Sequence, residues 1–293
     1  MRVPVCGALS IVLAQVSLDR DRCLTPSASR KLEVARCDTP RVDAELLLAH
    51  VLASTRSELR ADGRRQLSPS ELADFERMVE RREAREPLAY VLGEWGFRRL
   101  VLKTDARALV PRPETEVVVE RCLTLLAGRD EPRILDVGTG SGAIALALAQ
   151  EKSDAHVTGL DASSDALALA KENVERTGIR IELLQRDLFS GLPDGPWDVV
   201  VSNPPYVRPD EIDALPPEVG MWEPRLAVVG EGATATVARG ALQVLRSRGV
   251  LVLEVADGEA ARVAGLLREL GYGEVRITRD LAGRDRVVEG VRA

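Results

Sequence analysis

Aromatic residues are scarce in this chain of 293 residues, which has three each of tryptophan, tyrosine and phenylalanine. Histidine is scarcer still: the chain has two, so a mechanism that depends on histidine has few candidates. The four cysteines form no CxxC pair and no cluster with histidine; they are Cys6, Cys23, Cys37 and Cys122. We therefore expect no bound metal, no zinc site and no disulfide framework.

Long hydrophobic runs and an excess of positive charge are also missing. No stretch approaches the roughly 20 apolar residues of a transmembrane helix, so we expect no membrane association. The formal net charge is −6: residues 1–96 contain 15 basic and 15 acidic side chains, and residues 97–293 contain 25 against 31. Because nucleic-acid binders usually carry a basic stripe, we expect no direct nucleic-acid partner. Residues 3–16 are fairly apolar, but no small-residue cleavage site follows, which favours a cytoplasmic protein over a secreted one.

The hydrophobic pattern predicts a helical region ahead of a second, larger domain. Residues 1–25 have no clear assignment and are treated as an extension. Residues 26–94 read as a small helical domain without strands. Within it, Ser68 is expected to cap a helix that has Pro69 at its first position and Glu71 three residues after the cap.

The character of the chain changes at residue 95. Residues 95–112 are expected to form a hairpin linker, with one strand over Phe97–Lys103 and another over Ala108–Val110. Pro111 and Pro113 then force an extended path before the next helix.

From residue 113 to residue 293 strands and helices alternate. Apolar strands separated by helices indicate an α/β domain, with a mostly parallel sheet covered on both faces. The expected strands are Arg133–Val137, His156–Leu160, Arg180–Leu184, Asp198–Ser202, Val250–Val255, Glu274–Thr278 and Arg286–Val291. The expected helices are Gly142–Gln150, Ser164–Thr177, Ala233–Arg246 and Glu259–Leu270. Ligands of such sheets bind at the carboxyl ends of the strands.

A glycine-rich loop follows the first of these strands, and a helix begins directly after it. Its residues are Gly138, Thr139, Gly140, Ser141 and Gly142. Glycines allow a tight turn and a close approach to a ligand, and the helix N-terminus offers free N–H groups. The second strand ends at Asp161, whose carboxylate can accept both hydroxyls of a ribose. Asp136 suits a cationic ligand such as S-adenosylmethionine, and Asp187 is placed to meet an adenine amino group.

The fourth strand ends in Asn203, Pro204, Pro205 and Tyr206. Here the chain resembles the amino-methyltransferases, which carry an (N/D)PP(Y/F/W) motif at this point. The Asn203 side-chain oxygen and the Pro204 carbonyl can each accept one N–H of a planar NH2 group, and the prolines hold both acceptors in place. Tyr206 can pack on the flat face of the acceptor.

Further stretches resemble one branch of these enzymes, the PrmC/HemK family of peptide-chain release factor glutamine methyltransferases. The resemblance runs from about residue 30 to the C-terminus, and the stretches that carry it are EPLAYVLGE (86–94), LVPRPETE (109–116), NPPY (203–206), EPRLA (223–227) and LAGRDR (281–286). It implies a class I S-adenosylmethionine-dependent methyltransferase, Rossmann-like and seven-stranded. It also implies that the substrate is the glutamine of the GGQ motif in class I release factors.

The resemblance also implies roles for individual residues. The glycine loop, Asp161 and Asn203 would bind S-adenosylmethionine, and the NPPY motif would hold the glutamine amide. Many relatives have tryptophan where this chain has Leu188, so Leu188 and Phe189 are expected to form an apolar wall for the adenine. The helical domain would grip the release factor, and we expect a monomer.

Other interpretations stay open at this stage. A nucleic-acid adenine methyltransferase shares the acceptor motif, but it would have to flip the base out of the stack. A non-enzymatic S-adenosylmethionine-binding module would not need two fixed acceptors. An NAD dehydrogenase lacks a suitable acid or base near the fourth strand. The few aromatic residues group around the linker and after the third and fourth strands, which suggests a stacking or partner surface; among them are Phe97, Trp197 and Tyr206.

Overall fold

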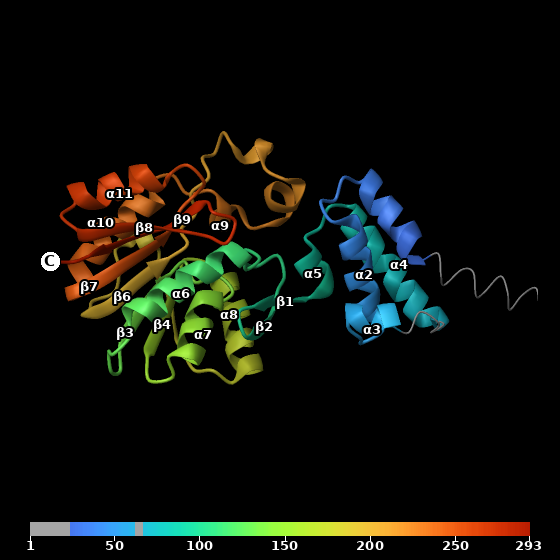
Figure 1. Ribbon diagram of the computed structural model, residues 1–293, viewed down its shortest axis with the longest axis horizontal. Helices are drawn as coiled ribbons and strands as arrows, with labels where there is room; N and C mark the ends of the chain where they lie inside the picture. Colours follow the sequence, from blue (N-terminus) through green and yellow to red (C-terminus); the bar gives the residue numbers. More distant parts are fainter. Residues whose placement is uncertain (1–23, 62–66) are drawn as a thin grey trace, which may run out of the picture. The chain divides into compact units, whose positions relative to one another are not determined.

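A computed structural model describes residues 24–61 and 67–293 (Figure 1). The chain divides into two compact units between Leu92 and Gly93. The extension expected over residues 1–25 lies almost wholly outside the described residues. Residues 95–112, expected to link two domains, belong to the larger unit.

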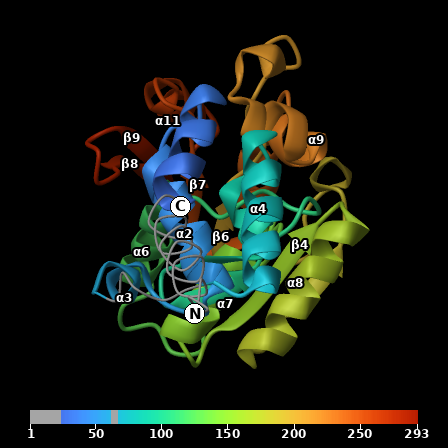
Figure 2. The same cartoon turned by 90° about the vertical axis from the view of Figure 1, so that its right-hand side faces the viewer.

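The smaller unit is helical. After a helix over residues 24–34 come α2 (Pro40–Val51), α3 (Arg56–Ala61), α4 (Pro69–Glu83) and α5 (Leu88–Leu92). The Ser68 hydroxyl accepts the Glu71 N–H and the Glu71 carboxylate accepts the Ser68 N–H, so the predicted capping box is present. Helices α2 and α4 lie side by side (Figure 2). The buried ion pair of Arg82 and Asp43, 2.8 Å apart, joins them.

The larger unit begins with a two-stranded antiparallel hairpin, β1 (Glu94–Phe97) and β2 (Leu100–Lys103). The expectation of one strand over Phe97–Lys103 is therefore wrong. The chain reverses at Arg98, whose φ of 50° places it in the left-handed region, and the two halves of the segment pair with each other. The second expected strand, Ala108–Val110, is also wrong: these residues pair with no strand, although Ala108 and Val110 are buried.

A seven-stranded sheet forms the centre of this unit, in the order β5-β4-β3-β6-β7-β9-β8. The five strands β5, β4, β3, β6 and β7 are parallel to one another, whereas β9 runs antiparallel to both β7 and β8. The strand bounds are β3 (Arg133–Val137), β4 (His156–Asp161), β5 (Glu182–Gln185), β6 (Trp197–Ser202), β7 (Leu245–Glu254), β8 (Gly273–Arg279) and β9 (Asp285–Val291). This is the mostly parallel, doubly covered sheet that the sequence predicts.

Helices cover both faces of the sheet (Figure 1). Those that follow β2, β3 and β4 lie on one face: α6 (Glu116–Leu125), α7 (Ala143–Glu151) and α8 (Ser164–Thr177). The other face carries α10 (Ala233–Val244) and α11 (Ala260–Glu269). Successive strand residues enter opposite cores, as Ile134 and Leu135 do, because side chains alternate along a strand.

The long connection after β6 has local structure of its own. It contains 3-10 turn η3 (Ile212–Ala214), single π-turn η4 (Glu218–Trp222) and α9 (Arg225–Val228). Phe97 and Trp197 do not belong to the suggested stacking or partner surface, because they are buried in the two cores. Phe189 and Tyr206 are exposed.

Candidate active site

The glycine loop leaves the carboxyl end of β3 and turns into α7. Its three glycines, 138, 140 and 142, have φ values of 75°, 55° and 82°, a region that favours glycine. The Leu160 carbonyl at the end of β4 accepts the N–H groups of Gly138 and Thr139, at 2.8 and 2.9 Å. The loop is thus fixed to the neighbouring strand, and the Gly142 N–H donates to the Thr139 carbonyl within the loop, at 2.8 Å.

Asp161 ends β4 beside this loop. One of its carboxylate oxygens accepts the Gly140 N–H and the other accepts the Ser163 N–H, both at 2.9 Å. Burial raises the pKa of Asp161, and these N–H groups oppose that rise. The carboxylate is therefore held in one orientation at the cavity wall, with acceptor capacity left for the paired hydroxyls of a ribose.

Asp136 is fully buried below the glycine loop and does not line the cavity. Its Oδ2 accepts the Thr139 hydroxyl at 2.7 Å, and its Oδ1 has no hydrogen-bond partner. Burial raises the pKa of Asp136 to about 7. The sequence places this acid at a cationic ligand; in the structure Asp136 instead contacts Thr139, and Thr139 lines the cavity.

A cavity of about 210 Å³ opens at the carboxyl ends of the central strands. It brings together nine of the residues that the sequence singled out: Gly138, Thr139, Gly140, Ser141, Asp161, Asp187, Leu188, Asn203 and Pro205. Gly142, Pro204 and Tyr206 do not line it. Leu188 and Phe189 form an apolar wall, and Asp187 accepts the Phe189 N–H at 2.9 Å.

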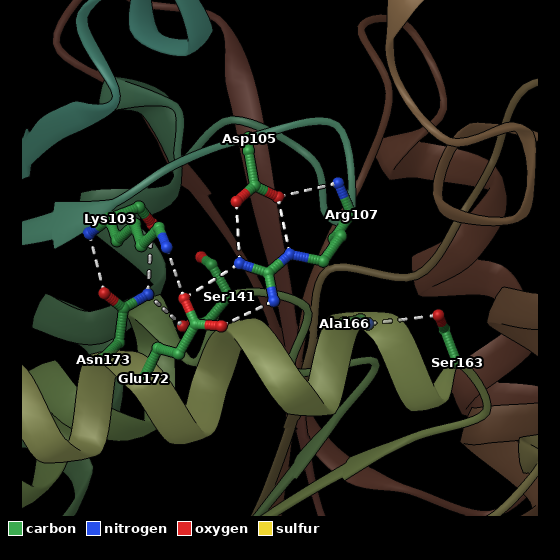
Figure 3. A network of polar contacts seen from close by, with 8 residues as sticks. All are labelled: Lys103, Asp105, Arg107, Ser141, Ser163, Ala166, Glu172 and Asn173. Atoms are coloured by element: carbon green, nitrogen blue, oxygen red, sulfur yellow. Dashed lines mark hydrogen bonds and ion pairs between the residues drawn. The ribbon is translucent and has the colours of Figure 1, made fainter.

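The segment after β2 supplies the opposite wall and is tied to α8 and to the glycine loop (Figure 3). Asn173 is fully buried; its side chain accepts the Lys103 N–H at 2.7 Å and donates to the carbonyls of Lys103 and Ser141. Arg107 forms ion pairs with Asp105 and Glu172. Sequence reasoning missed Asn173, because nothing in the helical pattern of α8 marks it as a contact to a loop.

Arg112 and Glu223 close a second connection, between the segment before α6 and the long connection after β6. Arg112 Nη2 lies 2.7 Å from both Glu223 carboxylate oxygens, and the Val110 N–H donates to Oε1 at 3.0 Å. The Glu223 side chain is fully buried, and burial raises its pKa. Arg112 also lines the cavity.

Asn203 lies directly after β6, next to the glycine loop. A Cβ atom at Gly138 would lie 4.0 Å from the Asn203 carbonyl oxygen, so the two loops approach each other closely. The Asn203 side-chain Nδ2 donates to the Thr115 hydroxyl oxygen at 3.4 Å. The Thr115 hydroxyl in turn donates to Glu254 at the end of β7, at 2.7 Å.

The rest of the acceptor motif is held by the chain that follows α9. Val207 forms a parallel bridge with Val229, and a Cβ at Gly230 would lie 2.5 Å from the Pro205 ring and from its carbonyl oxygen. Tyr206 is 40% exposed, and desolvation of its hydroxyl raises its pKa. The tyrosine ring is therefore available to an incoming group.

Two family models match the chain. The PrmC N-terminal domain matches residues 24–93, and the methyltransferase small domain matches residues 115–215. The release factor glutamine methyltransferase of Caulobacter vibrioides is 40% identical over 272 residues, which cover 91% of this chain and 94% of that protein. That of Deinococcus radiodurans is 40% identical over 278 residues, covering 93% and 98%. The chain belongs to the release factor glutamine methyltransferase family. The resemblance seen in the sequence is thereby confirmed.

The fold is that of class I methyltransferases. The T. thermophilus 16S rRNA N2 G1207 methyltransferase, solved with AdoMet and guanosine, superposes with a TM-score of 0.51 at 20% identity, over 68% of this chain and 50% of that one. As a member of the family, the protein is a methyltransferase that uses S-adenosylmethionine. The cavity fits this cofactor: it has a glycine loop, an acid at the end of β4 and an apolar wall.

Among residues 24–61 and 67–293, no helix has the length and hydrophobicity that a membrane span requires. No group of three or more histidine, cysteine or acidic side chains in the same part of the chain could hold a metal ion.

Proposed function

We propose that this protein transfers a methyl group from S-adenosylmethionine to the side-chain amide nitrogen of the GGQ glutamine in class I release factors. The observation that carries the proposal is the position of Asn203, which lines the cofactor cavity beside the glycine loop at the end of β6. The names and the similarity of the curated relatives support the choice of a release factor as substrate.

The roles of the cavity residues follow from their contacts. Asp161 would accept the ribose hydroxyls, Leu188 and Phe189 would cover the adenine, and Asp187 would accept its amino group. The glycine loop would let the methionine end of the cofactor approach the backbone closely. When bound, S-adenosylmethionine supplies an electrophilic methyl group on a positively charged sulfur.

The acceptor side needs two hydrogen-bond acceptors and no strong base. Asn203 Oδ1 and the Pro204 carbonyl would each accept one N–H of the glutamine amide, which aims the nitrogen at the methyl carbon. Held in this way, the amide nitrogen would receive the methyl group that S-adenosylmethionine supplies and would give up one proton to water. The products are N5-methylglutamine and S-adenosylhomocysteine.

The helical unit and the surroundings of the enzyme complete the proposal. We propose that residues 26–94 grip the body of the release factor while its GGQ loop reaches the cavity. We also propose that the enzyme acts as a monomer in the cytoplasm. The net charge of −6 supports the further proposal that it binds no nucleic acid.

Transfer of label from S-adenosylmethionine to a purified class I release factor tests this function. We expect label on the native factor, none on a version with GGA in place of GGQ, and loss of most turnover in Asn203→Ala with cofactor binding retained. Saturable, salt-sensitive labelling of nucleic acid, with no labelling of either factor, would instead favour an adenine methyltransferase.

A further inference from the structure

Asn203 must present its side-chain oxygen, not its nitrogen, to the amide group of the substrate. An asparagine amide has an acceptor on one side and two donors on the other, and the two orientations have nearly the same shape. With the nitrogen facing the substrate, two NH2 groups would oppose each other. The reaction therefore needs a device that selects one orientation.

We propose that Thr115 and Glu254 are positioning residues that fix the orientation of the Asn203 amide. This inference rests on the proposed function of the same site. The Thr115 hydroxyl is the shared atom: it donates to Glu254 Oε2 at 2.7 Å and accepts from Asn203 Nδ2 at 3.4 Å.

The direction of these bonds follows from counting hydrogens. A hydroxyl has one hydrogen, and an ionised carboxylate can only accept. While Glu254 is ionised, Thr115 must donate to it, so only lone pairs of the Thr115 oxygen remain for Asn203. The Asn203 nitrogen therefore turns toward Thr115, and Oδ1 is left for the substrate.

The setting of Glu254 makes this chain of bonds dependent on proton binding. Glu254 is 3% exposed at the end of β7, and burial raises its pKa to about 7. The charged and titratable groups that face it are Arg286 from β9, Arg112, Tyr206 after β6, and Glu114 from the 3-10 turn η1 (Pro113–Thr115); the two arginines lower the pKa of Glu254 and Glu114 raises it. A protonated Glu254 could donate to Thr115, which frees the hydroxyl hydrogen to bond Asn203 Oδ1 and permits the wrong orientation.

Thr115→Val removes the hydroxyl with little change in shape, and Thr115→Ser restores it. We expect Thr115→Val to lower kcat at saturating S-adenosylmethionine by about tenfold or more, and Thr115→Ser to recover most of that loss. The matched control is Thr124→Val, on an exposed threonine of α6 whose hydroxyl donates only to the Glu120 carbonyl. Cofactor affinity should stay within about twofold in all three variants.

The pH profile and a spectroscopic signal separate positioning from a general loss of structure. The wild-type kcat at saturating cofactor should fall as the pH drops below about 7, and Glu254→Gln should be slow and lack this acid limb. The side-chain NH2 resonances of Asn203, assigned by their absence in Asn203→Asp, should shift over the same pH range. They should also move in Thr115→Val and stay near their wild-type positions in Thr115→Ser.

The nuclear magnetic resonance measurement needs no substrate, so it tests the inference even if the release factor is not methylated. An inactive wild-type enzyme with the expected Asn203 shifts would contradict the proposed function and leave the positioning role intact. A Thr115→Val enzyme with wild-type kcat would overturn the positioning role. Asn203 resonances that shift neither in Thr115→Val nor with pH would also overturn it.

Discussion

Arg112 Nη2 lies 2.7 Å from both carboxylate oxygens of Glu223, although 111 residues separate them in sequence. This contact joins the segment before α6 to the end of the connection that carries η3 and η4. Because the Glu223 side chain is fully buried, Arg112 and the Val110 N–H compensate its charge. The segment before α6 and the end of this connection are therefore held together.

Arg112→Ala should destabilise the protein and weaken its binding of the release factor. Removing one partner of a buried ion pair costs about 3–5 kcal/mol, and the partial exposure of Arg112 places the expected loss at the lower end of this range. Denaturant unfolding measures the loss, and the KM for the release factor should rise with it. Arg208→Ala, which breaks an exposed pair with Glu211, is the control and should cost about 0–1 kcal/mol. Equal losses in the two variants would contradict this role for Arg112.

Gly230→Ala should slow the reaction without abolishing cofactor binding. A Cβ at Gly230 would lie 2.5 Å from Pro205, closer than atoms can approach, so the acceptor motif must shift. We expect kcat to fall by about tenfold or more, because displacements of about 1 Å at a reacting group are costly. Gly265→Ala in α11 is the control, since a Cβ there meets nothing within 4 Å. The prediction fails if both variants keep the wild-type kcat.

Local features of this fold could be predicted from sequence, whereas long-range contacts could not. The capping box at Ser68, helix α8 and strand β3 have the expected bounds, because their signals lie within a few neighbouring residues. The strand bounds expected for the hairpin are wrong, because the reversal at Arg98 carries no glycine, the usual mark of positive φ.

In the candidate site, too, local features could be predicted from sequence and long-range contacts could not. The glycine loop and the NPPY motif marked the cavity, since both are continuous in sequence. Glu223 and Glu254 were not assigned roles, because their importance depends on partners 111 and 139 residues away. An acid at the end of the apolar strand β7 was the only signal for Glu254.

Asn173→Asp should destabilise the segment that forms one wall of the cofactor cavity. Asparagine donates to the Ser141 and Lys103 carbonyls, and a carboxylate of the same shape would face those oxygens with no hydrogen to donate. Leaving buried groups unsatisfied costs about 1–3 kcal/mol each, so we expect a loss of at least about 2 kcal/mol and weaker binding of S-adenosylmethionine. Thermal unfolding and calorimetric titration measure the two effects. Glu175→Gln, on the exposed side of the same helix, should change stability by no more than about 0.5 kcal/mol.

Asp136 should couple pH to stability and to cofactor binding in opposite directions. Its pKa is about 7 in the folded protein, above its ordinary value of 3.8, so the folded state holds a proton that the unfolded state has released. From this group, stability therefore falls as the pH rises from about 4 through 7, and Glu254, also with a pKa of about 7, adds in the same direction. Binding of the cationic S-adenosylmethionine favours the ionised Asp136, so its affinity should rise over the same pH range.

Asp136→Asn separates the two effects. The variant should be more stable than the wild type at pH 8 without cofactor, because the charge of a fully buried carboxylate is gone. Its affinity for S-adenosylmethionine at pH 8 should be weaker by about tenfold and nearly independent of pH between 6 and 8. Calorimetric titration at several pH values measures the affinity, and denaturant unfolding at pH 8 measures the stability. A wild-type affinity that stays constant across this range would show that the charge of Asp136 does not affect cofactor binding. The role of Asp136 would then be limited to its hydrogen bond with Thr139.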